Sequence, residues 1–233
     1  MGMNVLGVSL SSLNSTLLGI RTTQHNIANA STPGYHRQEV RQSSSAPEFL
    51  GGNWLGTGVD TSNVVRMYSR FLDNELRTYE GQLAGSEAYA FYADQVDSLL
   101  GNTANNLDTA MQSFFVAVNE VANDPTSMAA REQMLTQGKN LAGRMQLLGG
   151  RLETLGTYVN QEVDTAVEQI NAYVQRIADL NAAIGFSGTL AQAPNDLLDQ
   201  RDQLVSELNK LVNVTQVQQS DGSIGVFMSN GQP

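Results

Sequence analysis

Apolar residues recur in steps of four and three along the first 30 residues, a spacing that places them on one stripe of a helix. The stripe, called the seam below, consists of Leu6, Leu10, Leu13, Leu17, Ile20 and Ile27, and polar Gln24 interrupts it. An isolated helix cannot cover such a stripe, and most helical stability comes from packing of the apolar face. We therefore predict that residues 1–34 form a coiled-coil segment whose seam is an assembly surface with no mate in this chain.

This helix is predicted to end at Thr32-Pro33-Gly34. Proline cannot continue a helix and disfavours the helical conformation at Thr32, while Gly34 can take the positive φ of a tight turn. The chain should therefore leave the helix at one defined place.

Composition excludes several classes of function. The net charge is −10 with only two lysines among the 233 residues, so no basic stripe is present for nucleic acid or for an anionic membrane surface. The chain lacks cysteine, which excludes disulfides and thiolate metal sites. No run approaches the roughly 20 apolar residues that a membrane span requires.

Residues 35–61 read as an extended connector, rich in Gly and Ser, whose later part from 43 to 61 is loop-like. Trp54, the single tryptophan, lies in this loop. Two roles are open for it: an anchor that packs the loop onto a helix, or a contact with another subunit.

Residues 62–212 are predicted to form a bundle of long helices, with segments at about 62–100, 104–121, 126–184 and 196–211. Asp124 is expected to cap the third helix, with Pro125 in its first turn, and Asn195 or Asp196 is expected to cap the fourth. The third helix has the clearest heptads, with one extra four-residue step and a Gly149-Gly150 pair that marks a bend. Its length, roughly 90 Å at about 1.5 Å per residue, predicts an elongated molecule.

After residue 212 the apolar period changes to two, and Asp221-Gly222 reads as the turn of a β-hairpin. Residues 213–233 are thus expected to begin a truncated β domain. The predicted fold is mainly α: an elongated coiled-coil or helical bundle with an extended connector and a C-terminal β-hairpin.

No catalytic pattern is present. His25 and His36 are the only histidines and have no patterned carboxylates beside them, and the glycines at 51–58 lack the Lys-Ser/Thr of a phosphate loop. Asp199, Arg201 and Asp202 are interpreted as an ion-pair network on an exposed helical face. We predict no enzyme activity, no cofactor and no metal.

One run of residues resembles a known family. Asn26-Ile-Ala-Asn29-Ala-Ser-Thr32-Pro33-Gly34-Tyr35-His36-Arg37-Gln38 is similar to the N-terminal signature of bacterial flagellar axial proteins. The continuation from Gly34 to Gln38 most resembles the hook-associated proteins of the hook–filament junction, although these more often have Ser where this chain has His36. Two later stretches agree, 58–72 and 196–204, so that the resemblance covers essentially all 233 residues. The matching motif residues are Asn26, Asn29, Thr32, Pro33, Gly34, Tyr35, Arg37 and Gln38.

The resemblance implies a secreted structural subunit that joins hook to filament, exported by the flagellar type III system without a cleaved signal. The implied partners are other copies of the chain, the hook protein, the next hook-associated protein, and an export chaperone that binds a C-terminal part beyond residue 233. The alternatives are a helical coiled-coil binding module, such as a chaperone or adaptor, and another rod or hook subunit of the axial family.

Overall fold

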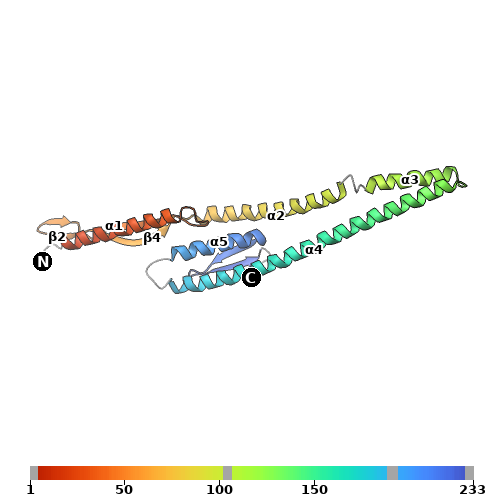
Figure 1. Ribbon diagram of the computed structural model, residues 1–233. Coiled ribbons are helices and arrows are strands. Elements are labelled where there is room, and N and C mark those ends of the chain that lie inside the picture. The colour runs from red at the N-terminus through yellow and green to blue at the C-terminus, as the bar shows by residue number, and fades with distance from the viewer. Residues whose placement is uncertain (1–4, 102–106, 188–193, 229–233) are drawn as a thin grey trace. The chain divides into compact units, whose positions relative to one another are not determined.

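The computed structural model describes residues 5–101, 107–187 and 194–228 (Figure 1). It is mainly α, as predicted, with short antiparallel strands in three separate pairs. The helices are α1 (Val5–Ala28), α2 (Arg70–Gly101), α3 (Leu107–Asn123), α4 (Met128–Ser187) and α5 (Asn195–Leu211). The strands are β1 (Gln38–Ser44), β2 (Glu48–Leu50), β3 (Asn53–Leu55), β4 (Val59–Arg66), β5 (Val214–Gln218) and β6 (Ile224–Met228).

The chain forms two compact units. The first, called the terminal unit, comprises residues 1–82 and 170–233, and the second, called the helical unit, comprises residues 83–169. The boundaries fall inside α2 and α4, so each of these helices contributes to both units.

The connector is more regular than the sequence indicates. β1 and β4 pair antiparallel from Gln38 opposite Arg66 to Ser44 opposite Val59, with an irregularity between Arg41 and Gln42. The prediction of helix from residue 62 is wrong, because β4 continues to Arg66 and α2 begins at Arg70.

Inside this ladder lies a second, smaller hairpin. β2 and β3 pair antiparallel across Gly51-Gly52, where both glycines have positive φ, 62° and 89°. A two-residue turn of this kind matches the twist of the strands and requires positive φ at both positions. The prediction of an irregular loop over 43–61 is thus wrong for β2 and β3, and also for residues 43–44 of β1 and 59–61 of β4.

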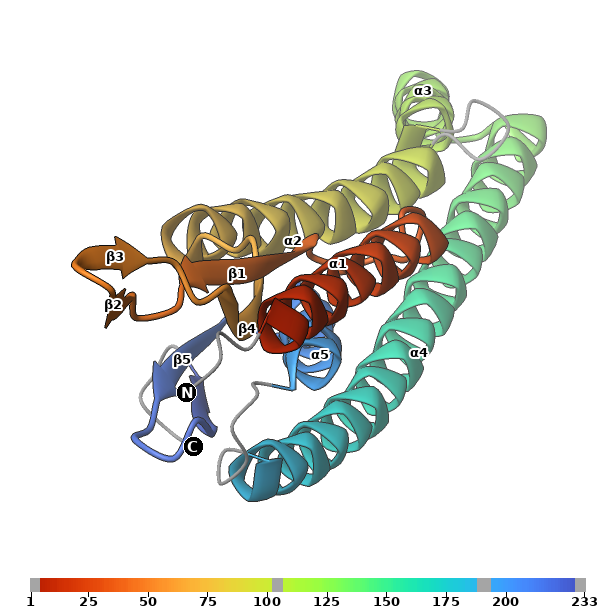
Figure 2. The same ribbon diagram turned by 90° about the vertical axis from the view of Figure 1, so that its left-hand side faces the viewer.

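Helix α1 lies along the β1–β4 ladder (Figure 2) and contacts both strands. Its packed face carries small residues, among them Ser15, 3% exposed, and Thr22, 8% exposed. Near the start of the helix, Gly58 of the connector approaches Val8 and Ser11 so closely that a Cβ on Gly58 would lie 2.5 Å from the Ser11 hydroxyl. The helix therefore has a partner in its own unit, but on a polar, small-residue face that carries no apolar period.

The apolar core of the terminal unit lies where α5 meets the end of α4 and the β5–β6 hairpin. Its buried members are Ile177, Leu204, Val205, Leu208 and Ile224. Asn181 ties α4 to the hairpin, because its side chain donates to the Ile224 carbonyl at 2.9 Å and accepts from the Ile224 N–H at 3.1 Å. The predicted C-terminal hairpin is confirmed, with Gly222 at φ 86° in its turn.

In the helical unit, α3 buries Ala110 and Ala117, and a Cβ on Gly138 of α4 would lie 3.5 Å from the Phe114 ring. Tyr92 of α2 donates a hydrogen bond to Glu162 of α4. The helix α4 runs without interruption through Gly149 and Gly150.

Two of the predicted helix caps are wrong. The carboxylate of Asp124 accepts from the backbone N–H of Thr126 within a turn, and Ser127 Oγ, rather than Asp124, accepts from the N–H of Ala130 in the first turn of α4. Pro194, rather than Asn195 or Asp196, precedes the first residue of α5. The side chain of Asn195 instead donates to the carbonyl of Val64 in β4 at 2.9 Å.

Candidate functional site: the seam and the motif network

The seam lies open on α1. Its residues are exposed by 82% (Leu6), 59% (Leu10), 57% (Leu13), 43% (Leu17), 50% (Ile20) and 71% (Ile27). Six exposed apolar side chains therefore share one helical stripe, and clustered apolar exposure of this kind is a reason to consider an interaction surface. The opposite face of α1 packs on the β1–β4 ladder, so the helix is held in place while the seam stays accessible.

The motif residues fix the place where α1 turns into β1. The side-chain oxygen of Asn26 accepts from the Tyr35 hydroxyl at 2.7 Å and from the Gln38 N–H at 2.8 Å. The Asn26 amide donates back to the Gln38 carbonyl at 2.9 Å. One asparagine thus mimics a strand partner for the first residue of β1, and it joins the last helical turn to the connector.

The turn between them follows the predicted chemistry. Asn29 donates from both its backbone and its side chain to the His25 carbonyl, each at 3.1 Å, and Thr32 donates to the Asn29 side chain at 3.2 Å. Gly34 has φ 74°, a conformation that strongly favours glycine. A Cβ at Gly34 would also lie 2.5 Å from the Gln203 side-chain oxygen, so this glycine allows close approach to α5.

The remaining motif residues have distinct positions. Pro33 and Arg37 are exposed, and the Arg37 carbonyl accepts from the N–H of Met67 at 2.8 Å. Gln38 is buried, and its amide donates to Asp196 of α5 at 2.7 Å. Asp196 also lies 3.1 Å from His25 Nε2, which links the end of α1 to the start of α5.

A buried carboxylate on α5 organises this junction. Asp199, 5% exposed, accepts from the His36 N–H at 3.0 Å and lies 2.8 Å from His36 Nδ1. The guanidinium of Arg66, at the end of β4, lies 2.8 Å from Asp199 and 2.7 Å from Asp202. The guanidinium carbon of Arg66, Cζ, also lies 4.3 Å from the centre of the Tyr68 ring, within cation–π range. Together with Asn26, Tyr35 and Gln38 these residues form what we call the motif network.

Burial and neighbouring charges shift the pKa values of three groups in and around this network. Burial alone would lower the pKa of Arg66, but Asp202 and Asp199 outweigh it and the pKa is raised. Burial lowers the pKa of Arg201, Asp202 opposes this, and Arg66 lowers it further. Burial, with Asp202 and Asp73 nearby, raises the pKa of Tyr68 to about 12, so its phenol is neutral and donates to Asp73 at 3.0 Å.

Asp199, Arg201 and Asp202 do take part in ion pairing and hydrogen bonding, but the predicted exposed face is wrong. They are 5%, 3% and 8% exposed. Arg201 donates to the side chain of Asn181 at 3.1 Å and to the Gly222 carbonyl at 2.8 Å. Sequence reasoning assigned no role to His36 or Arg66. Charged residues recur among the regularly spaced leucines of α5. This pattern could have indicated the network, because a charge that becomes buried needs a partner.

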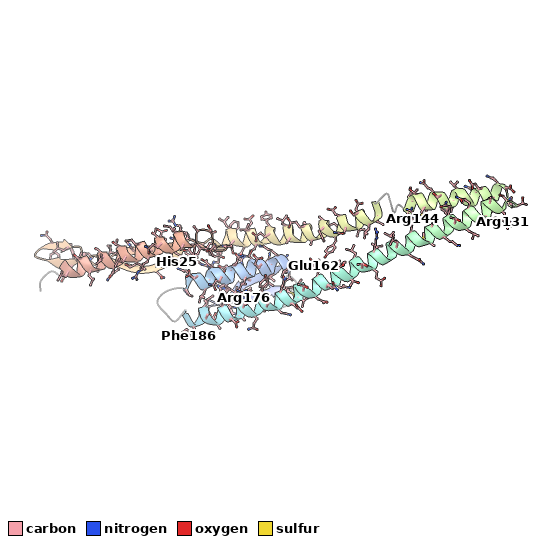
Figure 3. The ribbon with its side chains drawn as sticks, in the orientation of Figure 1. His25, Arg131, Arg144, Glu162, Arg176 and Phe186 are labelled. Atoms are coloured by element: carbon pink, nitrogen blue, oxygen red, sulfur yellow. The ribbon has the colours of Figure 1, made fainter. Side chains whose placement is uncertain are left out.

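Beside the network lies a hollow of about 320 Å³, lined by residues of α1, the turn, α4 and α5. Its lining includes His25 of α1 and Arg176 of α4, and both residues are labelled in Figure 3. Among the described residues, no group of three or more His, Asp or Glu side chains is arranged to hold a metal ion. No helix in the described part of the chain has the length and apolarity of a membrane span.

Comparison with known proteins places these features in a family. Residues 93–233 match the family model described as the flagellar hook-associated protein FlgK helical domain. The chain is 34% identical over 230 residues to flagellar hook-associated protein 1 of Salmonella typhimurium, and 33% identical to that of Escherichia coli K12. Each alignment covers 98% of this chain and 42% of the relative, so the chain spans less than half the length of these relatives.

A solved structure agrees. The flagellar hook junction protein FlgK from Burkholderia pseudomallei is 32% identical and superimposes with a TM-score of 0.61, covering 69% of this chain and 28% of that one. The signature from Asn26 to Gln38, the heptads of α4 and these similarities have one explanation. The chain belongs to the FlgK family of flagellar hook-associated proteins.

Proposed function

We propose that this chain is part of a structural subunit that joins the flagellar hook to the filament and assembles through the seam of α1. The observation that carries the proposal is the exposed seam on a helix whose other face is already packed. Burial of each seam side chain contributes about 1.5–3 kcal/mol, so six of them supply a large driving force for association. The motif network fixes where the chain leaves α1 and enters β1, and this orients the seam.

The proposed partners are other copies of the chain, the hook protein, the next hook-associated protein and an export chaperone. The subunit reaches the cell exterior through the flagellar type III system. Its role is structural rather than catalytic. Support comes from the names of its relatives, which are flagellar hook-associated proteins.

The test is a charge on the seam. Leu13→Asp or Leu17→Asp places a carboxylate where an apolar contact forms, which costs more than an empty cavity. Incorporation into flagella, measured by electron microscopy and motility of a strain carrying the variant full-length protein, should be lost. The helix content by circular dichroism should remain, because both residues lie on the exposed face.

Ser12→Asp is the matched control, since it adds the same charge to an exposed, off-seam position of the same helix. It should assemble and support motility. Normal incorporation of the Leu13→Asp protein would refute the assembly role of the seam.

A further inference from the structure

Residues 5–66, which we call the arm, are tied to one another at both ends of α1. The helix contacts β1 and β4 along its length (Figure 2), Gly58 lies close against its start, and Asn26 bonds both backbone groups of Gln38 at its end. Trp54 on the β2–β3 hairpin is 70% exposed beside Phe49, so it does not anchor the arm to a helix. Because helix and ladder are joined in this way, we expect the arm to move as one body.

The apolar core of the terminal unit is built without the arm. Among the described residues, the buried and partly buried members of this core all lie between residues 170 and 226, in α4, α5, the β5–β6 hairpin and the joint at Val212. Arg201 adds polar ties within the same segment, since it donates to the side chain of Asn181 and to the Gly222 carbonyl. Residues 170–228, which we call the docking core, therefore supply their own apolar and polar contacts.

The arm meets the docking core through polar contacts with the first two turns of α5. These contacts pair His25 and Gln38 with Asp196, His36 and Arg66 with Asp199, Arg66 with Asp202, and the Val64 carbonyl with Asn195. Buried polar and charged pairs add little net stability, because the water that they lose offsets most of what they gain. The docked position of the arm is thus well specified but weakly held.

The hollow of about 320 Å³ lies at this same junction. The arm lines it with His25, Pro33 and Tyr35, and the docking core lines it with Arg176 and Leu180 among others. Protein interiors are otherwise close-packed, and side chains that border an unfilled space lose the dispersion contacts they would make there. Incomplete packing therefore weakens the junction further.

We infer that the arm docks as one body onto a docking core that forms first, and that it leaves the core as one body, turning at residues 67–69 between β4 and α2. The contacts that dock it join residues 131 to 171 positions apart. Closing so long a loop costs conformational entropy that a few polar contacts repay only once α5 is in place. The arm is the last part of the terminal unit to form and the first to open, and the direction of the seam is set only while the arm is docked.

Hydrogen exchange of the full-length protein, followed by mass spectrometry, tests the opening. Peptides from α1, β1 and β4 should exchange through one common opening, at least tenfold faster than peptides from α5 and the β5–β6 hairpin. Equal protection of the arm and the docking core would overturn the inference. Fast exchange confined to α1 would overturn it as well, because that pattern is fraying of one helix and not release of the arm.

Arg66→Met tests the contact that holds the arm. Arg66 can pair with Asp199 and Asp202 only while the arm is docked, and both carboxylates regain water when it leaves. The variant should therefore speed exchange in the arm at least tenfold and leave the β5–β6 hairpin unchanged. Arg41→Met makes the same substitution at an exposed position of β1 and should leave the exchange of the arm unchanged. Equal acceleration of arm and docking core in Arg66→Met would show that they open together, against the inference.

Pulse labelling during refolding from urea tests the order of events. Amides of α5 and the β5–β6 hairpin should gain protection before those of β1 and β4, and protection of the arm first or at the same time would contradict late docking. Leu13→Asp changes the exposed face of α1 and should leave this order as it is. Docking of the arm and assembly through the seam can therefore fail independently of each other.

Discussion

The carboxylate of Asp199 accepts a hydrogen bond from the backbone N–H of His36 at 3.0 Å and lies 2.8 Å from Nδ1 of the same residue, 163 positions away in the chain. This contact brings the family signature after α1 against α5. Arg66 from β4 completes the junction, so three segments that are distant in sequence meet at the carboxylate of Asp199. The exit of α1 is therefore set by the whole terminal unit and not by Pro33 and Gly34 alone.

Removing this carboxylate should destabilise the terminal unit. In Asp199→Ala, Arg66 loses one of its two carboxylate partners while it stays mostly buried, and breaking a buried pair costs about 3–5 kcal/mol. We expect a loss of that order in the free energy of unfolding from urea denaturation followed by circular dichroism. Asp179→Ala, at an exposed position of α4, should change it by less than about 0.5 kcal/mol. Equal effects of the two variants would show that the network contributes little.

Gly34→Ala should be destabilising for two separable reasons. The residue must adopt φ 74°, which costs a non-glycine residue about 1 kcal/mol, and its Cβ must displace the Gln203 side chain. A double-mutant cycle with Gln203→Ala isolates the steric part. The double variant should recover stability relative to the sum of the single changes. Strict additivity would contradict the close approach of the turn to α5.

Ser15→Leu tests the packed face of α1. Ser15 is 3% exposed against the ladder, and forcing a larger side chain into a packed interface costs about 1–3 kcal/mol. The amides of α1 should exchange faster with solvent in this variant than in the wild type. Ser12→Leu adds the same side chain at an exposed position and should leave exchange nearly unchanged. Equal exchange in both variants would mean that α1 does not rest on β1 and β4 in solution.

The raised pKa of Tyr68 predicts that the stability of the fold depends on pH in the alkaline range. Burial, Asp202 and Asp73 raise its pKa to about 12, above the value of about 10 in an unfolded chain. The neutral phenol therefore stabilises the fold fully below about pH 10, and this contribution is lost as the pH rises from about 10 to 12. In a difference titration of phenolate absorbance between the wild type and Tyr68→Phe, one tyrosine should titrate near pH 12. A midpoint near pH 10 would contradict the buried, acid-flanked environment.

Local patterns in the sequence suffice for much of this structure. Heptad spacing predicts α4 from Leu141 to Ile184, because a long helix repeats one apolar face many times and needs no information from elsewhere in the chain. The seam of α1 and the β5–β6 hairpin with its Asp221-Gly222 turn are equally local.

Tertiary structure alone decides what local pattern leaves open. The strands around Glu48 and Asn53 are too short for a period to be read, and they form because Gly51 and Gly52 close a turn. Ser15 and Thr22 look like solvent-facing residues until the β1–β4 ladder covers them. Asp199 reads as part of an exposed helix face, and it becomes a buried partner only when His36 and Arg66 are brought to it by the fold. Periodicity within a helix is set by its own residues, whereas the burial of a charge depends on partners far away in the chain, which no local pattern encodes.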